Sequence, residues 1–549
     1  MTDNMPAEDV LNWFKDRQPA SSDGQVRYGA ALLASGQEKA GRAALRAAWV
    51  GGNFSKRPER RFYRRYRKYL TRLDHIERLD RLIWRGRYWP ARRMLWKVNA
   101  DWRALSEARL MLMRMNGNVD RAIERVPAAL KGHPGLVYER LRWRRRKGLD
   151  TAAALLDGVP ADPAHAEKWW RERSILARRA LAKGHISEAY RLVQEHGLEE
   201  GPAFAEAEWL AGWIMLRFLN ERATAFRHFK AMFKSVTYPI SRARGAYWAA
   251  RAAEEAKKKK LAKLWYRSAA RYSTTYYGQL AAARLAPGST TKLAPDPEPS
   301  PKEAEAFAKQ ELVRAFEILN MLGERERLRP FILRLSEIRE SPAWQKLTAD
   351  LARAHHRPDL AIAVAKKASR AGRDLIMAGY PTLSLPPVRL GKPRLEVPLV
   401  LAVVRQESAF QPEAQSGAGA RGLMQLLPRT ARDVAKELKV KYARHRLTTD
   451  PRFNLKLGQA YLASLLSAFE GSYVLALAAY NAGPARARRW MRMHGNPRDA
   501  TIDAVDWIEM IPIEETRNYI QRVMEGVQVY RGRLNGLEVA LSLERDLKR

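Results

Sequence analysis

Residues 398–407 read Pro-Leu-Val-Leu-Ala-Val-Val-Arg-Gln-Glu, an almost wholly apolar stretch that ends in a carboxylate. The composition is that of a buried helix, and Glu407 stands at its end. Removing a carboxylate from water without a partner is costly, so packing around Glu407 should raise its pKa and favour the protonated acid. A protonated carboxylic acid in a cleft can cleave glycosidic bonds, whereas a glutamate that merely ends a core helix points to solvent.

Three downstream segments place polar groups beside predicted turns. Residues 416–428 read Ser-Gly-Ala-Gly-Ala-Arg-Gly-Leu-Met-Gln-Leu-Leu-Pro, and their glycines predict a loop where backbone can approach a ligand closely. Gln425 in this loop offers both a donor and an acceptor. Residues 478–484, Ala-Ala-Tyr-Asn-Ala-Gly-Pro, bring a phenol and an amide to a helix end. Residues 507–519, Trp-Ile-Glu-Met-Ile-Pro-Ile-Glu-Glu-Thr-Arg-Asn-Tyr, form the third segment.

Together and in this order, these segments resemble the catalytic domain of lytic transglycosylases, bacterial enzymes that cut the peptidoglycan glycan strand. The resemblance covers about residues 395–535. Its motifs are Glu407-Ser408, Gly422-Leu-Met-Gln425, Ala479-Tyr-Asn-Ala-Gly-Pro484 and Glu515-Thr-Arg-X-Tyr519. Upstream, residues 241–248 (Ser-Arg-Ala-Arg-Gly-Ala-Tyr-Trp) and 276–284 (Tyr-Tyr-Gly-Gln-Leu-Ala-Ala-Ala-Arg) are similar to stretches of the large soluble murein transglycosylases. The resemblance therefore implies a ring of helices before the catalytic domain.

The resemblance implies chemistry built on one catalytic residue, Glu407. This acid would protonate the oxygen of the β-1,4 bond between N-acetylmuramic acid and N-acetylglucosamine. The resulting carboxylate would take a proton from the muramic C6 hydroxyl, which attacks C1 and closes a 1,6-anhydro ring without consuming water. A positioned intramolecular nucleophile has a high effective concentration, which explains how a single acid can suffice. No cofactor and no metal are implied.

The remaining motif positions imply a substrate-binding groove around the acid. The expected substrate-binding residues are Ser416, Met424, Gln425, Tyr480, Asn481 and Glu509. Ser416 would hydrogen-bond the substrate or the acid, and Met424 and Gln425 would line the groove. Tyr480 would place its phenol beside the acid. Asn481 would contact sugar or brace its turn, and Glu509 would support the groove as a buried polar residue.

Two other functions are compatible with the same residues. A hydrolase like the goose-type lysozymes would need a second carboxylate about 5–10 Å from Glu407. The nearest downstream candidates are Glu413, in a proline-containing loop, and Asp433, in the helix predicted after Pro428. The other alternative is a non-enzymatic basic solenoid that binds a polyanion, and the presence of Glu407 argues against it.

Charge is unevenly distributed along the 549-residue chain. The net charge is +40, of which residues 1–385 carry +31 and residues 386–549 carry +9. Such a field attracts polyanions, either nucleic acid or carboxylate-bearing peptidoglycan. The resemblance favours peptidoglycan strands as the partner, with other cell-wall enzymes as further candidates. Binding of nucleic acid is not expected. The chain has no cysteine, which excludes disulfides and thiol catalysis, and its ten histidines show no metal-type spacing.

The sequence predicts no membrane anchor. No apolar run approaches the ~20 residues that a transmembrane helix needs. The first ten residues contain no basic region followed by an apolar stretch, so no export signal is visible. Because the resemblance implies a periplasmic location, we expect that a signal peptide has been removed from this chain.

Residues 1–285 predict an irregular α-helical solenoid. A glycine or asparagine is followed five residues later by a small residue at intervals of 31 to 50 residues. These pairs are Gly36/Gly41, Gly86/Ala91, Gly117/Ala122, Gly148/Ala153, Gly184/Ala189 and Asn220/Ala225. The first member would end one helix in the left-handed conformation, and the second would let the next helix pack closely. We expect Trp169, Trp170, Trp209, Trp213, Trp248 and Trp265 in the core between the helical hairpins.

Two proline-rich segments, residues 287–301 and 380–398, hold five prolines each and cannot be helical throughout. They divide an all-α protein into three predicted parts. These are an α-solenoid (superhelical ring) over residues 1–300, a helical linker domain over 301–385, and a lysozyme-like, mainly α catalytic domain over 386–549. The last long helix is predicted to begin near Glu514.

Overall fold

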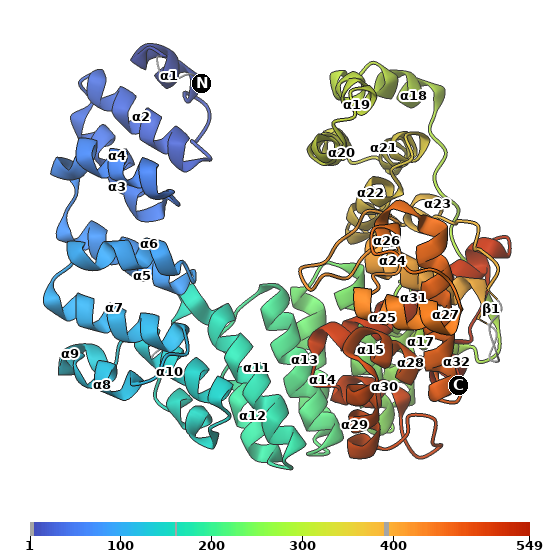
Figure 1. Ribbon diagram of the computed structural model, residues 1–549. Helices are drawn as coiled ribbons and strands as arrows, with labels where there is room; N and C mark the ends of the chain where they lie inside the picture. The colour runs from blue at the N-terminus through green and yellow to red at the C-terminus, as the bar shows by residue number, and fades with distance from the viewer. Residues whose placement is uncertain (1–4, 160–161, 389–394) are drawn as a thin grey trace. The chain divides into compact units, whose positions relative to one another are not determined.

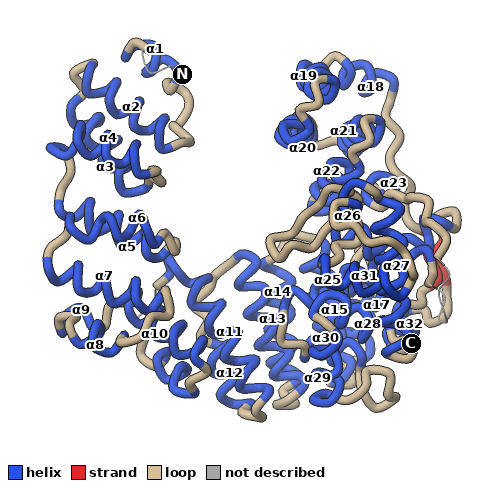
Figure 2. Tube along the Cα trace, in the orientation of Figure 1, coloured by secondary structure: helices blue, strands red, loops and turns tan. Residues whose placement is uncertain are grey.

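The computed structural model describes residues 5–159, 162–388 and 395–549, and almost every element in these ranges is a helix (Figures 1 and 2). The strands are β1 (Thr290–Lys292) and β2 (Glu538–Ala540), which pair antiparallel with Thr291 opposite Val539. The predicted all-α class is confirmed, and the small sheet is an addition to it. No helix in the described ranges is long and apolar enough to cross a membrane.

The first of two compact units comprises the residues up to Leu176 together with Glu195–Leu198. Its helices are α1 (Ala7–Trp13), α2 (Ser22–Ala34), α3 (Glu38–Gly51), α4 (Lys56–Tyr66), α5 (Arg72–Trp84), α6 (Tyr88–Met94), α7 (Ala100–Met113), α8 (Val119–Glu124), α9 (Ala128–Lys131) and α10 (Pro134–Lys147). Short 3-10 helices are η1 (Arg67–Tyr69), η2 (Leu95–Lys97), η3 (Asp150–Leu156) and η4 (Pro163–His165). Helix α11 (Ala166–Ala182) contains the boundary between the units.

The second unit comprises Ala177–Gln194 and Glu199–Arg549. Its helices before the linker region are α12 (Ile186–Gln194), α13 (Gly201–Arg217), α14 (Arg222–Ser235), α15 (Pro239–Glu255), α16 (Lys259–Ala270) and α17 (Tyr276–Leu285). The next group is α18 (Pro301–Ala308), α19 (Glu311–Met321), η5 (Arg325–Arg327), α20 (Leu328–Ile338), α21 (Pro342–Ala354), α22 (Pro358–Arg370) and α23 (Ile376–Gly379). The last group is α24 (Val397–Ser408), α25 (Pro428–Glu437), α26 (Arg446–Thr449), α27 (Pro451–Ala468), α28 (Tyr473–Ala482), α29 (Pro484–His494), α30 (Ala504–Met510), α31 (Glu514–Leu534) and α32 (Leu543–Leu547).

The predicted helix-ending residues adopt the expected conformation with one exception. Gly36, Gly86, Gly148, Gly184 and Asn220 all have φ between 60° and 81°. Gly117 does not, because Met115 and Asn118 take the left-handed conformation on either side of it. The small residue that follows each of the six positions is buried, as close packing of the next helix requires. The solenoid prediction is confirmed, and its closure into a ring stays a prediction.

The tryptophans predicted to be inter-hairpin core are buried, apart from the half-buried Trp265. Trp265 packs edge-on against Phe226 and Phe233, at centroid distances of 5.7 and 5.1 Å. Helices α18–α22 surround a core of their own, which includes Phe316, Ile332 and Trp344. This separate core supports the proposed linker domain at residues 301–385, whose boundaries stay a prediction. Pro393, in the second proline-rich segment, lies outside the described residues.

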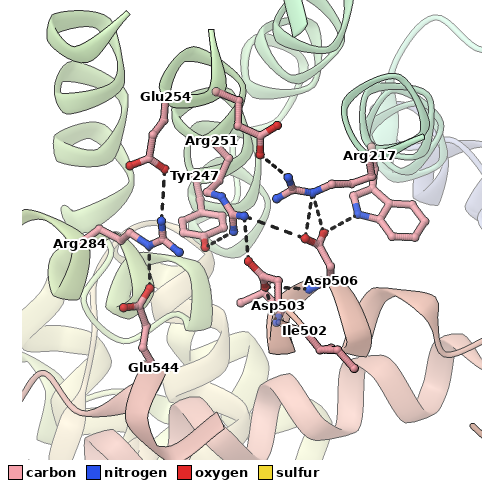
Figure 3. A network of polar contacts seen from close by, with 12 residues as sticks. Arg217, Tyr247, Arg251, Glu254, Arg284, Ile502, Asp503, Asp506 and Glu544 are labelled. Atoms are coloured by element: carbon pink, nitrogen blue, oxygen red, sulfur yellow. Dashed lines mark hydrogen bonds and ion pairs between the residues drawn. The ribbon is translucent and has the colours of Figure 1, made fainter. Parts of the chain in front are cut away.

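Ion pairs join the end of the chain to helices α13, α15 and α17 (Figure 3). The pairs are Arg217–Asp506, Arg251–Asp503 and Arg284–Glu544, with N–O distances of 2.9, 2.8 and 2.7 Å. Asp503 also accepts hydrogen bonds from the first backbone N–H groups of α30, so one carboxylate both caps this helix and holds it against α15. The final helices are thereby fixed to the helical array.

A second cluster, centred on the buried carboxylate of Glu509, lies between the same elements. Arg244 of α15 donates to Glu206 at 2.7 Å and lies 3.3 Å from a carboxylate oxygen of Glu509. Glu509, in α30, has no exposed surface and also accepts hydrogen bonds from Tyr277 and Gln521. Since buried carboxylates need cations and donors to offset lost hydration, each member depends on the others.

We predict that Arg244→Ala destabilises the protein by about 3 kcal/mol, because it removes a cation shared by the buried carboxylate of Glu509 and the partly buried one of Glu206. The measurement is the free energy of unfolding in urea, followed by tryptophan fluorescence. Arg227→Ala is the matched control, since Arg227 is exposed and, among the described residues, its side chain donates to the nearby Thr224 hydroxyl. Equal stability of the two variants would show that the cluster does not need Arg244.

Candidate active site

Helix α24 places Glu407 at the edge of the core. Its residues Leu399–Val404 are all buried, and the helix packs along α31. The Arg405 side chain donates to the carbonyl of Gly379 at 2.7 Å, and its guanidinium lies 4.0 Å from the centre of the Tyr380 ring. The predicted buried helix is confirmed, and its last turn leaves the Glu407 side chain only partly exposed.

Burial raises the pKa of Glu407 to about 7, as the sequence predicted. The Tyr519 hydroxyl beside it acts in the opposite direction, and the negative charge of Glu515 adds to the increase. Burial raises the pKa values of the Tyr480 and Tyr519 phenols well above their usual range, and the nearby charge of Glu407 raises them further. An acid in this environment holds its proton near neutral pH, which is the condition for general-acid chemistry.

Tyr519 carries a buried hydroxyl that forms no hydrogen bond of ordinary geometry within the described residues. Tyr480, by contrast, donates to the Met424 carbonyl at 2.7 Å. The Tyr480 phenol thus uses its hydrogen to bind the glycine-rich loop, while the hydrogen of the Tyr519 phenol can be donated to the acid. A buried phenol beside a carboxyl can hydrogen-bond the ionised form as that form develops.

Backbone after α24 turns sharply. Ala409 and Phe410 have φ of 50° and 63°, a conformation that non-glycine residues seldom adopt twice in succession. The glycine-rich loop then doubles back, with Arg421 bridging to both Gln415 and Leu426. Gly422 has φ of 77°, and a Cβ there would lie 2.0 Å from the Leu447 carbonyl oxygen. The loop is therefore packed tightly against α26 and α27 and holds one conformation.

Two predicted groove residues, Met424 and Gln425, hold the loop rather than leaving their side chains free. The Met424 side chain is fully buried against Gly458. Gln425 has φ of 44°, and its amide nitrogen donates to the carbonyls of Ala414 and Gly422 at 3.0 and 2.9 Å. Their predicted contacts with substrate stay predictions, and the structure assigns both residues a share in the loop's shape.

Ser416, Asn481 and Glu509 lie at different places around the site. Ser416 is exposed, and its Oγ accepts a hydrogen bond from the Ala420 N–H at 3.0 Å inside the loop turn. Asn481 accepts from the Thr516 hydroxyl at 2.7 Å, which ties the end of α28 to the start of α31. Glu509 is enclosed by protein donors and presents no surface to a sugar, so its role here is to support α31.

The carboxylate that acts electrostatically on Glu407 is Glu515, which is exposed in the first turn of α31. The sequence had instead suggested Glu413 and Asp433 as second carboxylates. Both are exposed, and Glu413 lies 3.9 Å from Arg325 of the linker region. Glu515 belongs to a recognised motif, and its place one turn before Tyr519 is the signal that could have identified it.

Asn454 is the site residue that sequence reasoning missed completely. Its side chain is fully buried and accepts from the Met424 N–H at 2.9 Å while donating to the carbonyls of Arg421 and Leu447, both at 3.0 Å. It thereby satisfies three backbone groups of the loop region. No local pattern marks this asparagine, which lies in the first turn of helix α27.

No group of three or more potential metal ligands occurs within the described ranges. The groups gathered at the described site include the carboxyl of Glu407 and the phenols of Tyr480 and Tyr519.

We predict that Gly422→Ala lowers the thermal unfolding midpoint, because the new Cβ meets the Leu447 carbonyl and the Asn454 side chain at a positive φ. A cost of about 3 kcal/mol is expected from strain and displaced hydrogen bonds. Gly417→Ala is the matched control in the same loop, since a Cβ at Gly417 meets nothing within 4 Å. Scanning calorimetry distinguishes the two, and an unchanged midpoint for Gly422→Ala would contradict the packing described.

A pH-dependent effect on stability is predicted for Glu407→Gln. The folded state, with the pKa of Glu407 raised to about 7, binds the proton more tightly than the unfolded chain does. The free energy of folding gained from this tighter proton binding has its full value below the ordinary glutamate pKa of 4.5. It is lost as the pH rises toward 7. The neutral variant should therefore match the wild type near pH 4 and exceed it near pH 8, by up to about 3 kcal/mol.

Urea unfolding of both proteins at the two pH values measures this difference. The control is Glu437→Gln, a change of the same kind at an exposed position. A stability difference between Glu407→Gln and wild type that stays constant with pH would contradict the burial of the carboxyl.

Comparisons with known proteins agree with this site. Residues 388–502 match the family model described as the transglycosylase SLT domain. The soluble lytic murein transglycosylase of Escherichia coli is 39% identical over 132 residues, which is 24% of this chain and 20% of that protein. The membrane-bound lytic murein transglycosylase C of Serratia proteamaculans is 28% identical over 170 residues, covering 27% and 47%. The matched region thus spans about a fifth of the length of the soluble relative.

Two solved structures share the fold over almost the whole chain. An inactive mutant of lytic transglycosylase Slt from Pseudomonas aeruginosa superposes with a TM-score of 0.71, at 23% identity, over 96% of this chain and 84% of that one. The 70-kDa soluble lytic transglycosylase of Escherichia coli gives 0.59, at 19% identity, over 98% and 85%. Residues 388–502 carry a transglycosylase SLT domain, and the chain is similar in fold to the soluble lytic transglycosylases, with an α-solenoid before a lysozyme-like domain.

Proposed function

We propose that this protein is a lytic transglycosylase that cuts the glycan strands of peptidoglycan in the periplasm. The observation that carries the proposal is Glu407, a carboxyl with its pKa raised to about 7, held beside Tyr519 in a segment that matches the SLT family. Relatives named soluble lytic murein transglycosylases support the same substrate class. The bond cut would be the β-1,4 link between N-acetylmuramic acid and N-acetylglucosamine.

In the first step, Glu407 donates its proton to the bridging oxygen as the bond to C1 breaks. Its raised pKa leaves a large share of the carboxyl protonated at neutral pH, and the nearby charge of Glu515 contributes to that increase. Such general-acid assistance contributes about 10²–10⁴-fold to the rate. The Tyr519 hydroxyl, which lacks another partner among the described residues, would stabilise the carboxylate left behind.

In the second step, the Glu407 carboxylate accepts the proton of the muramic C6 hydroxyl, and that oxygen bonds to C1. The carboxyl ends protonated and ready for another cycle, and no water enters the products. A group with a pKa near the working pH serves as acid and as base with similar ease, so the value of about 7 suits both steps.

A peptidoglycan hydrolase is the second candidate, and Glu515 is the observation that favours it. Glu515 is exposed and close enough to influence Glu407, so it would be the carboxylate to activate a water molecule. The two mechanisms differ in their products, because hydrolysis adds one water and ring closure adds none.

The test is mass spectrometry of fragments released from purified peptidoglycan sacculi. We expect muropeptides lighter than the hydrolysis products by one water, and a loss of about 10³-fold or more in their release by Glu407→Gln. Glu437→Gln, at an exposed position on α25, should retain wild-type turnover. Sedimentation with sacculi should show that Glu407→Gln still binds.

Products that carry an added water and disappear in Glu515→Gln would establish the hydrolase instead. Normal cleavage by Glu407→Gln would remove this residue from the mechanism. Binding to sacculi without any release of fragments by the wild type would favour the non-enzymatic polyanion-binding alternative.

A further inference from the structure

A basic hollow of about 420 Å³ lies in the first compact unit, between helices α10 and α11 and the turn that follows α5. From α10 it is lined by the side chains at positions 138, 142 and 145, and from α11 by those at 168, 171 and 175. Spacings of three and four residues place each set along one face of its helix. The two helix faces and the turn at Gly86 therefore enclose the hollow together.

Cations outnumber carboxylates around this hollow. The carboxylates that line it belong to Glu139 and Glu172, and both residues are buried. Glu172 accepts hydrogen bonds from the guanidinium of Arg145, and a carboxylate oxygen of Glu139 lies 3.4 Å from a guanidinium nitrogen of Arg142. The cations that line the hollow are Arg85, Arg142, Arg145, Arg146, Lys168 and Arg171. Six positive and two negative side chains leave the lining with a formal charge of +4.

Four of these cations have no acidic partner. Arg85, Arg146, Lys168 and Arg171 form no ion pair within the part of the chain that the structure describes. The three arginines are exposed and Lys168 is half-buried, so a ligand can reach all four from solvent. Cations gathered around a hollow repel one another, and an anion bound between them relieves that repulsion. The hollow therefore favours a ligand that carries more than one negative charge.

The Tyr138 hydroxyl adds an uncharged donor to the hollow. The ring of Tyr138 lies between Trp84 and Trp169, at centroid distances of 5.0 and 5.3 Å, and 6% of the residue is exposed. Its hydroxyl forms no hydrogen bond with any described residue, although buried polar groups nearly always have a partner. Burial first, and then the charge of Glu172, raises the pKa of Tyr138 to about 12, so the hydroxyl keeps its hydrogen and can donate it.

We propose that this hollow binds a ligand through a phosphate or diphosphate group. A phosphate monoester carries a charge of about −1.5 to −2 and three strong acceptor oxygens, whereas a carboxylate carries one charge and two oxygens. Arginine forks match phosphate oxygens in pairs, and the Tyr138 hydroxyl supplies a further donor. The site contains no residue of the SLT segment at 388–502, so it adds a binding activity that does not depend on the proposed function.

The test is isothermal titration calorimetry of the full chain with inorganic pyrophosphate at constant ionic strength. The first variant is Tyr138→Phe, which removes the hydroxyl donor and keeps the ring in place. The second variant is Arg146→Ala/Arg171→Ala, in which both changed residues are exposed and unpaired within the described ranges.

The matched control is Arg121→Ala/Arg125→Ala. It removes the same charge from exposed positions of the same compact unit, and neither arginine lines the hollow. Thermal unfolding verifies that all variants fold like the wild type.

We expect the control to bind pyrophosphate as tightly as the wild type does. Tyr138→Phe should bind it about 10-fold more weakly, and Arg146→Ala/Arg171→Ala at least about 10-fold more weakly. An equal concentration of acetate should not displace pyrophosphate. The proposal would be overturned by a wild type that does not bind pyrophosphate, by equal binding of the second variant and the control, or by displacement with acetate.

A second arm distinguishes a lipid headgroup from a soluble phosphorylated molecule as the source of the group. It uses sedimentation with phosphatidylcholine vesicles that contain phosphatidic acid, whose headgroup is a phosphate monoester. Retention on these vesicles that Arg146→Ala/Arg171→Ala loses and the control keeps supports the site with a lipid source. Binding of pyrophosphate without retention supports it with a soluble source. Neither arm involves cleavage of a glycan, so failure of the proposed function would leave these outcomes unchanged.

Discussion

The contact between Glu509 and Gln521 joins helix α31 to the buried carboxylate of α30, and the site around Glu407 depends on that helix. Glu509 accepts from Gln521 at 2.9 Å, and the same carboxylate is held by Arg244 and Tyr277 from the helical array. Tyr519 lies two residues before Gln521, with its hydroxyl beside Glu407. Because α31 packs along α24 as well, a change in the buried cluster would move the phenol relative to the acid.

Two glutamates of this domain, the fully buried Glu509 and the partly exposed Glu407, have opposite electrostatic surroundings. Glu509 is surrounded by cations and donors, with Arg244 at 3.3 Å and Arg517 at 3.7 Å. Glu407 has a phenol and a second carboxylate nearby, and its pKa is raised to about 7. The chain has 99 lysines and arginines, and a cation close to Glu407 would lower the pKa of this carboxyl. The fold must therefore keep cations away from it. The apolar residues of α24 and the phenols of Tyr480 and Tyr519 surround the acid with uncharged groups.

The sequence predicted features that depend on local patterns. The apolar run before Glu407 indicated a buried helix, and the glycines at Gly36 and Gly148 indicated helix ends, because each conclusion needs only neighbouring residues. Partners such as Asn454 and Met424 lie 30 residues apart and leave no periodic trace. The side chain of Met424 is fully buried, which the motif alone could not show, and its expected place along the groove stays a prediction.

The contacts between the helical array and the end of the chain explain why two upstream segments, residues 241–248 and 276–284, resemble the large soluble transglycosylases. Residues 241–248 contain Arg244 and residues 276–284 contain Tyr277, and both side chains contact Glu509 of α30. Residues 276–284 also contain Arg284, which pairs with Glu544 of α32 (Figure 3). These positions are therefore constrained by the catalytic segment, although they lie far from it in sequence. The basic excess of residues 1–385 has a corresponding structural use, because Arg217, Arg244, Arg251 and Arg284 are paired with carboxylates.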